Sequence, residues 1–206
     1  MIPNPLETLM TEHRLIERVL EALEACARRA EGGAEVQPAA LRGFARFLRG
    51  YADELHHGKE EALLFEKMVE AGFPREVGPV AVMRIEHEQG RALVGELRAL
   101  SERVSWSAED RRRAASVALD FAALLRAHIL KEDRILYPMA EQRLSPQAMQ
   151  LLGEECQAFV ERHLDTDREL EALGIALEKE WGGQSPAPAL ADDHHAACSV
   201  CSAHGR

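Results

Sequence analysis

The sequence predicts an all-α protein: an up-down-up-down four-helix bundle with an additional C-terminal helix and a flexible tail. Alanine, leucine, glutamate and arginine dominate the composition, whereas β-branched and aromatic residues are scarce, and this balance favours helix over sheet. Apolar residues recur at the spacing of one helix face in five segments of the chain. The connections between these segments are short, which favours antiparallel neighbours in a bundle.

The first two helices have clear start and stop signals. Asn4 can cap the first helix, with Glu7 three residues on to complete a capping box, and Gly32 follows the last periodic residue. Pro38 opens the second helix, which is expected to stop at Gly72.

The next two helices are bounded in the same way. Pro74 and Pro79 bracket the start of the third helix. Ser107 starts the fourth, with Asp110 at the third helical position. Because proline lacks an N–H and clashes with the preceding turn, Pro138 is expected to kink or terminate the last turn of the fourth helix.

The end of the chain is expected to contain a fifth helix and a tail. Ser145 opens a helix predicted over residues 146–181. We therefore divide the chain into a helical bundle over residues 1–181, with its core motifs in 5–142, and a tail over 182–206. The tail has neither the periodicity nor the apolar content to fold by itself, so we expect it to be flexible.

Charge and hydropathy exclude two classes of partner. The formal net charge of −10 argues against nucleic acid, whose binding needs a basic stripe. No apolar run reaches membrane-spanning length, and the N-terminus lacks the basic and apolar regions of a signal peptide. Cys26 and Cys156 each lie alone in a helical pattern and fit reduced core thiols. We therefore expect a cytoplasmic protein that binds neither nucleic acid nor membrane.

An internal repeat identifies candidate metal ligands. The stretch HHGKEEALLFE from His56 aligns without gaps on HILKEDRILYP from His128, so that Glu60 falls on Glu132. Each copy places a carboxylate four residues after a histidine, on the same helix face. The alignment favours His56 over its neighbour His57, although His57 lies three residues before Glu60 and also reaches that face.

The other two core helices each place one histidine on the apolar stripe, namely His13 and His87. A lone histidine in such a position is usually a satisfied core residue. Four imidazoles and two carboxylates in one core would instead leave several buried charges unpaired, and a cation removes that cost. Imidazole and carboxylate ligands suit a pair of iron or manganese ions, whereas a structural zinc site would use cysteines, and none is placed for it.

These motifs together resemble those of the hemerythrin-like (HHE cation-binding) family. The matching segments are LMTEH ending at His13, HHGKEEALLF, IEHE around His87, and HILKEDRILYP, all within residues 5–142. The resemblance implies a non-haem centre of two iron ions, oxo- or hydroxo-bridged, with manganese as the weaker alternative. Glu60 and Glu132 would bridge the ions, and the terminal ligands would be His13, His56, His87 and His128.

The chain departs from the oxygen-carrying members of this family at one position. Those proteins have five histidine ligands, two of them four residues apart on the third helix, and here the residue four after His87 is Arg91. His57 is the nearest group that restores the count, followed by Glu61 or Glu86. His163 on the fifth helix is either a further ligand or outer contact, or a histidine at the seam between helix and bundle. We favour the seam, because four helices already close the site.

The tail carries a separate motif. Cys198, Cys201 and His204 have the spacing of half a zinc site or of a redox pair. The simpler interpretation is a low-complexity tail with incidental thiols.

The leading functional hypothesis is a di-iron protein that binds or senses O₂, NO or peroxide, with an electron-donor protein as a further partner. A metal centre with an open position can bind such a ligand without a reactive side chain. One alternative is an iron-dependent enzyme that handles NO or peroxide or repairs iron–sulfur centres, as some related proteins do. A third is an iron sensor or store, whose fold depends on the ion.

Overall fold

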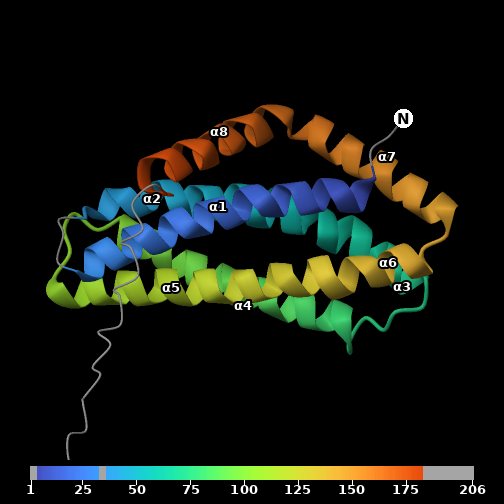
Figure 1. Cartoon of the computed structure of the whole chain (residues 1–206), viewed down its shortest axis with the longest axis horizontal. Coiled ribbons are helices and arrows are strands. Elements are labelled where there is room, and N and C mark those ends of the chain that lie inside the picture. Colours follow the sequence, from blue (N-terminus) through green and yellow to red (C-terminus); the bar gives the residue numbers. More distant parts are fainter. Residues whose placement is uncertain (1–3, 33–35, 183–206) are drawn as a thin grey trace, which may run out of the picture.

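The computed structural model describes residues 4–32 and 36–182, and every regular element in these residues is helical. Figure 1 shows long helices packed side by side, with the last two arched over one side. Three π-helical segments, η1–η3, interrupt the α-helices. The elements in order are α1 (Pro5–Glu31), α2 (Pro38–Phe47), η1 (Leu48–His57), η2 (Glu60–Leu64), α3 (Phe65–Glu70), α4 (Pro79–Ser101), α5 (Ala108–Lys131), η3 (Glu132–Leu136), α6 (Tyr137–Arg143), α7 (Pro146–Arg162) and α8 (Leu164–Trp181).

The helix starts predicted from capping residues are confirmed. Oδ1 of Asn4 accepts a hydrogen bond from the backbone N–H of Leu6, at 3.0 Å, at the start of α1. Ser107 and Asp110 form a reciprocal capping box at the start of α5. These side chains satisfy N–H groups that have no partner within the helix, so they fix where each helix begins.

The bundle consists of four antiparallel rods: α1, the run from α2 to α3, α4, and the run from α5 to α6. α1 packs along α5, α2 along α4, and α4 along α5. Buried apolar side chains form two clusters, and along α1 the first contains Leu9 and the second contains Ile16. His13 lies between them, so the candidate ligands form a polar layer that separates two apolar parts of the core.

Two of the π-helical segments, η2 and η3, lie at equivalent positions in the two repeated motifs, and η1 leads into the first motif. In η3 the N–H of Tyr137 donates to the carbonyl of Glu132, five residues earlier, and Phe65 pairs with Glu60 in the same way at the end of η2. Such a widened turn is frequent at functional sites. Of the two outcomes expected at Pro138, a kink or an end of the helix, the structure does not show an end: helix continues to Arg143. The regular pairing is interrupted by the widened turn directly before the proline.

The C-terminal helix predicted over residues 146–181 is two helices. The break is at His163, whose φ of −118° and ψ of 14° are not helical. Its ring Nδ1 lies 2.8 Å from the carbonyl oxygen of Phe159, so the side chain takes up one of the acceptors that a helix end leaves unpaired. The bend lets α8 turn along α1 and α2, and Figure 1 shows the resulting arch.

Two further expectations from the sequence concern membrane-spanning helices and the C-terminal tail. Among the described residues, no helix combines the length and the apolar character that a membrane crossing requires. Residues 183–206 of the expected tail, with Cys198, Cys201 and His204, lie outside the part of the chain that the structure describes.

Candidate metal centre

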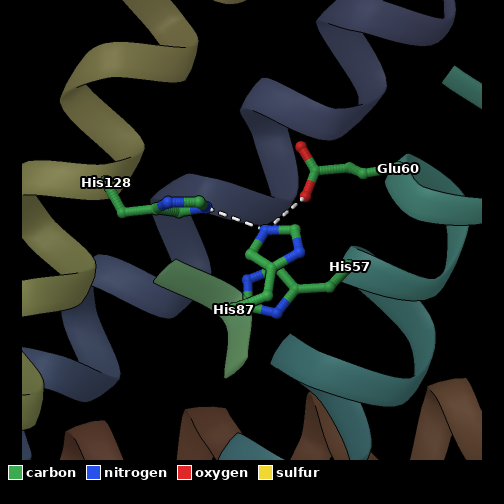
Figure 2. A group of neighbouring side chains, drawn as sticks. All are labelled: His57, Glu60, His87 and His128. Atoms are coloured by element: carbon green, nitrogen blue, oxygen red, sulfur yellow. Dashed lines mark hydrogen bonds and ion pairs between the residues drawn. The ribbon is translucent and has the colours of Figure 1, made fainter. Parts of the chain in front are cut away.

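Two groups of potential ligands meet in the middle of the bundle. In each group the four ligand atoms lie within 4.8 Å of one another, and Glu60 belongs to both groups. Figure 2 shows the first group, in which the His87 ring lies between Glu60 and His128 and over His57. The first group is His57, Glu60, His87 and His128, and the second is His13, His56, Glu60 and Glu132.

Each rod of the bundle contributes to this layer. His13 comes from α1, His87 from α4 and His128 from α5, while the paired histidines end η1. His56 and His57 are adjacent in sequence, yet both join the cluster, one in each group. We attribute this to the π-helical turn, which changes the direction of successive side chains relative to an α-helix.

The two glutamates lie between the histidine groups. Glu132 Oε2 is 3.3 Å from His13 Nε2, and Glu132 Oε1 is 3.1 Å from His128 Nε2. Glu60 Oε2 is 3.6 Å from Nε2 of both His56 and His87. Each carboxylate therefore reaches a histidine of either group, as a carboxylate shared by two cations would.

The unpaired atoms of the cluster fit a bound cation. His56 Nε2, Glu60 Oε2 and both carboxylate oxygens of Glu132 are buried, and none has a hydrogen-bond partner in the described residues. Leaving such atoms without a partner costs more than a lost hydrogen bond, so their concentration at one point needs a compensating group. Nitrogen and oxygen donors without sulfur suit a transition-metal cation, and the residues present therefore fit a metal site.

An outer set of carboxylates fixes four of the histidine rings. Each carboxylate oxygen lies 2.7–2.8 Å from the Nδ1 atom of a ring, so that Nδ1–H donates outward and Nε2 faces the centre. The pairs are Asp133 with His13, Glu12 with His56, Glu61 with His87, and Glu86 with His128. His57 differs, because its Nδ1 lies 3.6 Å from Asp53 and has no hydrogen-bond partner among the described residues.

Basic side chains in turn hold the outer carboxylates, and the arrangement repeats across the bundle. Lys59 pairs with Glu12, and Lys131, its counterpart in the repeat, pairs with Glu86. Arg91 binds Glu61 at 2.6 Å. The same guanidinium binds Asp53 at 2.8 Å. Arg91 therefore takes no part as a ligand but ties two of the carboxylates that face the histidine layer.

The charges in the cluster shift the pKa values of its members in opposite directions. Burial and the neighbouring carboxylate of Glu132 raise the pKa of Glu60 well above its usual range. Burial also opposes ionisation of Glu132, but the attraction of His128 and His13 outweighs it and lowers the pKa of Glu132. For His13, the hydrogen bond to Asp133 and the negative charge of the nearby Glu132 outweigh burial and raise the pKa to about 9. Burial and the neighbouring His87 lower the pKa of His57 to about 3.

The structure brings together all six residues that the sequence indicated as ligands, together with His57. Glu61 and Glu86, proposed as further ligands or outer contacts, face ring nitrogens from outside the cluster. His163 lies at the junction of α7 and α8 and belongs to neither group. Glu12 and Asp133 are outer partners that the sequence did not single out. The signal available was their position next to His13 and Glu132 respectively.

A small cavity reaches the first group of ligands. It is about 20 Å³ in volume, which is room for a molecule the size of water. Its walls are mainly apolar and come from η1, α4 and α5, while His57, His87 and His128 contribute to one side. Only a very small guest could therefore approach the histidines by this route without movement of the helices.

The sequence comparisons agree with this geometry. The family described as hemerythrin HHE cation binding domain matches residues 4–140. Similar proteins include uncharacterized proteins of Mycobacterium tuberculosis and Mycobacterium bovis, each 29% identical over 135 residues. The aligned part is 64% of this chain and 51% of each relative, so the chain spans about half the length of those proteins. The family match covers the polar layer and every rod around it: the chain belongs to the hemerythrin HHE cation-binding domain family.

Proposed function

We propose that the protein holds two iron ions in the histidine–glutamate layer and uses them to bind or sense a small ligand, either O₂, NO or peroxide. The observation that carries this proposal is the pair of ligand groups sharing Glu60, with buried and unpartnered donor atoms on both glutamates. In this proposal His13 and His56 hold one ion, and His57, His87 and His128 hold the other. Glu60 and Glu132 lie between them.

The donor set supports iron, with manganese as the weaker alternative, over structural zinc. Five imidazoles and two carboxylates without cysteine are hard-to-borderline ligands, which suit iron and manganese and are not the ligands of structural zinc sites. When bound, a pair of iron ions supplies the one-electron and O₂ chemistry that side chains cannot perform. The protein's own part is to orient the imidazoles through the outer carboxylates and to keep bulk water away.

The apolar cavity beside the first ligand group favours a very small guest. Its volume of about 20 Å³ leaves no space for an organic substrate.

The free, buried thiols of Cys26 and Cys156 fit a reducing compartment, and we place the protein in the cytoplasm for this reason.

Metal analysis and gas binding test the proposal. Protein purified without oxygen should contain two iron ions per chain, and Mössbauer spectroscopy should resolve two iron environments. In air, an O₂-binding centre should develop a visible charge-transfer band that disappears under argon. Consumption of NO with a reductant would instead establish turnover. A chain that takes up fewer than two ions under iron-saturating conditions contradicts the proposal.

A further inference from the structure

The hydroxyl of Tyr137 contacts only one of the two shared carboxylates. Tyr137 is fully buried, and its hydroxyl donates a hydrogen bond to Oε1 of Glu60 at 2.5 Å. The same hydroxyl lies 3.4 Å from Nε2 of His13, and the two rings stack with centroids 5.6 Å apart. The phenol is thus fixed both by its ring and by its oxygen.

This contact makes the two glutamates unequal. Glu60 has one oxygen occupied by Tyr137, and its other oxygen, Oε2, is unpartnered and equidistant from His56 and His87 at 3.6 Å. Neither oxygen of Glu132 has a hydrogen-bond partner among the described residues; Oε2 is nearest His13 and Oε1 is nearest His128. Glu60 therefore faces both histidine groups with one oxygen, whereas Glu132 offers a separate oxygen to each group.

The internal repeat shows that Tyr137 breaks an otherwise symmetric arrangement. Phe65 occupies the position equivalent to Tyr137, and its ring stacks near His87 with centroids 5.8 Å apart, much as Tyr137 stacks near His13. Phenylalanine has no hydroxyl, so nothing equivalent occupies an oxygen of Glu132. The difference between the two glutamates therefore follows from one hydroxyl group.

We propose that Tyr137 is a positioning residue that, by holding Oε1 of Glu60, makes this glutamate share one oxygen between the two cation positions while Glu132 gives one oxygen to each. The inference rests on the part of the proposed function that places two cations in the layer. It does not depend on which small ligand the centre binds. Its consequence is that Glu60 and Glu132, although equivalent in the sequence repeat, hold the cations in different ways.

Infrared difference spectroscopy tests this inference on the full chain. Metal-free protein labelled with ¹³C in the glutamate carboxyl groups is compared before and after anaerobic addition of Fe²⁺. A carboxylate held through one oxygen separates its two stretching bands more widely than one held through both. The wild type should give one widely and one narrowly separated pair, and Glu60→Gln should remove the wide pair. Tyr137→Phe should retain two ions and convert the wide pair into a second narrow one.

Tyr51→Phe is the matched control, because Tyr51 is the only other tyrosine of the chain and is also buried, stacked on Phe47. It should leave both carboxylate pairs unchanged. An unchanged spectrum in Tyr137→Phe overturns the inference. A visible phenolate-to-iron band that is present in the wild type and absent from this variant also overturns it, because Tyr137 would then be a ligand. If Tyr137→Phe does not fold, the wild-type spectrum decides: two narrow pairs overturn the inference. A wild type that takes up fewer than two ions fails the proposed function itself.

Discussion

At the scale of single residues, Glu132 should contribute most to metal retention. Both of its oxygens are buried without a hydrogen-bond partner in the part of the chain that the structure describes, and each lies near a histidine of a different ligand group. Glu132→Ala should therefore reduce the content below two ions per chain and destabilise the fold by about 3 kcal/mol, because it strands buried imidazoles. Glu178→Ala is the control, since within the described part of the chain the ion pair of Glu178 is with the exposed Arg18. Elemental analysis decides, and two ions retained in Glu132→Ala would contradict the assignment.

Metal binding should also release protons, because His13 holds one at neutral pH. The pKa of His13 is raised to about 9, and burial with the charge of Glu132 raises the pKa of Glu60. Ligands must lose these protons, so affinity should fall as the pH falls, and the proton released from His13 should disappear above pH 9. Calorimetry at pH 7 in two buffers with different heats of ionisation measures the release. Equal heats in the two buffers would show that no proton leaves.

The sequence predicted the inner residues better than the outer ones. The histidines and Glu60 and Glu132 could be found because ligand positions must share a helix face with apolar neighbours, which leaves a periodic signal. Glu12 and Asp133 are adjacent to ligands and therefore point away from that face, toward a neighbouring rod. A charged residue there looks the same as a solvated one until the packing partner is known. His57 remained open for a similar reason, because its direction depends on a local π-helical turn.

At the scale of elements, start signals were predictable and interruptions were not. Asn4 and Ser107 each cap their own helix within a few residues, so their effect can be predicted from the local sequence. The break at His163 serves the packing of α8 on α1 and α2, and no glycine or proline marks it. The π-helical segments likewise follow from ligand placement in three dimensions, so helical periodicity alone does not reveal them.

Helix α8 packs closely on α2 and η1 because small residues lie at the contact. A Cβ atom at Gly174 would lie 2.5 Å from the ring of the fully buried Phe47. Gly174→Ala should therefore lower the free energy of unfolding by about 2 kcal/mol through overpacking. It should not change the ion content, since the polar layer is elsewhere. Denaturant unfolding measures the first effect and elemental analysis the second.

Gly95→Ala is the matched control for this prediction. Gly95 is exposed on α4, and a Cβ atom there would meet nothing within 4 Å. Because alanine is the better helix former, this change should stabilise the protein by about 0.5–1 kcal/mol. Equal effects of the two substitutions would mean that α8 does not pack closely on the bundle.

At the scale of the whole molecule, the polar layer divides the core into two apolar clusters. Residues from all four rods meet in this layer, so its charges must be balanced before either cluster can pack against it. Without cations, the buried carboxylates and imidazoles can balance one another only through ion pairs such as those of Glu132 with His13 and His128. The metal should therefore stabilise the entire bundle and not merely the site.

Stability should consequently depend on iron concentration. An ion that binds only the folded state adds about 2.7 kcal/mol when its free concentration is a hundred times its dissociation constant, so two ions should add about 5 kcal/mol. Denaturant unfolding, followed by the helical circular dichroism signal, measures this difference between anaerobic Fe²⁺ and a chelator. Mg²⁺ is the control and should have no effect, since it prefers oxygen ligands and retains its water. An ion that binds only the folded chain must raise the free energy of unfolding. Coincident unfolding curves with Fe²⁺ and with chelator would therefore mean that the charges of the polar layer are balanced without a cation.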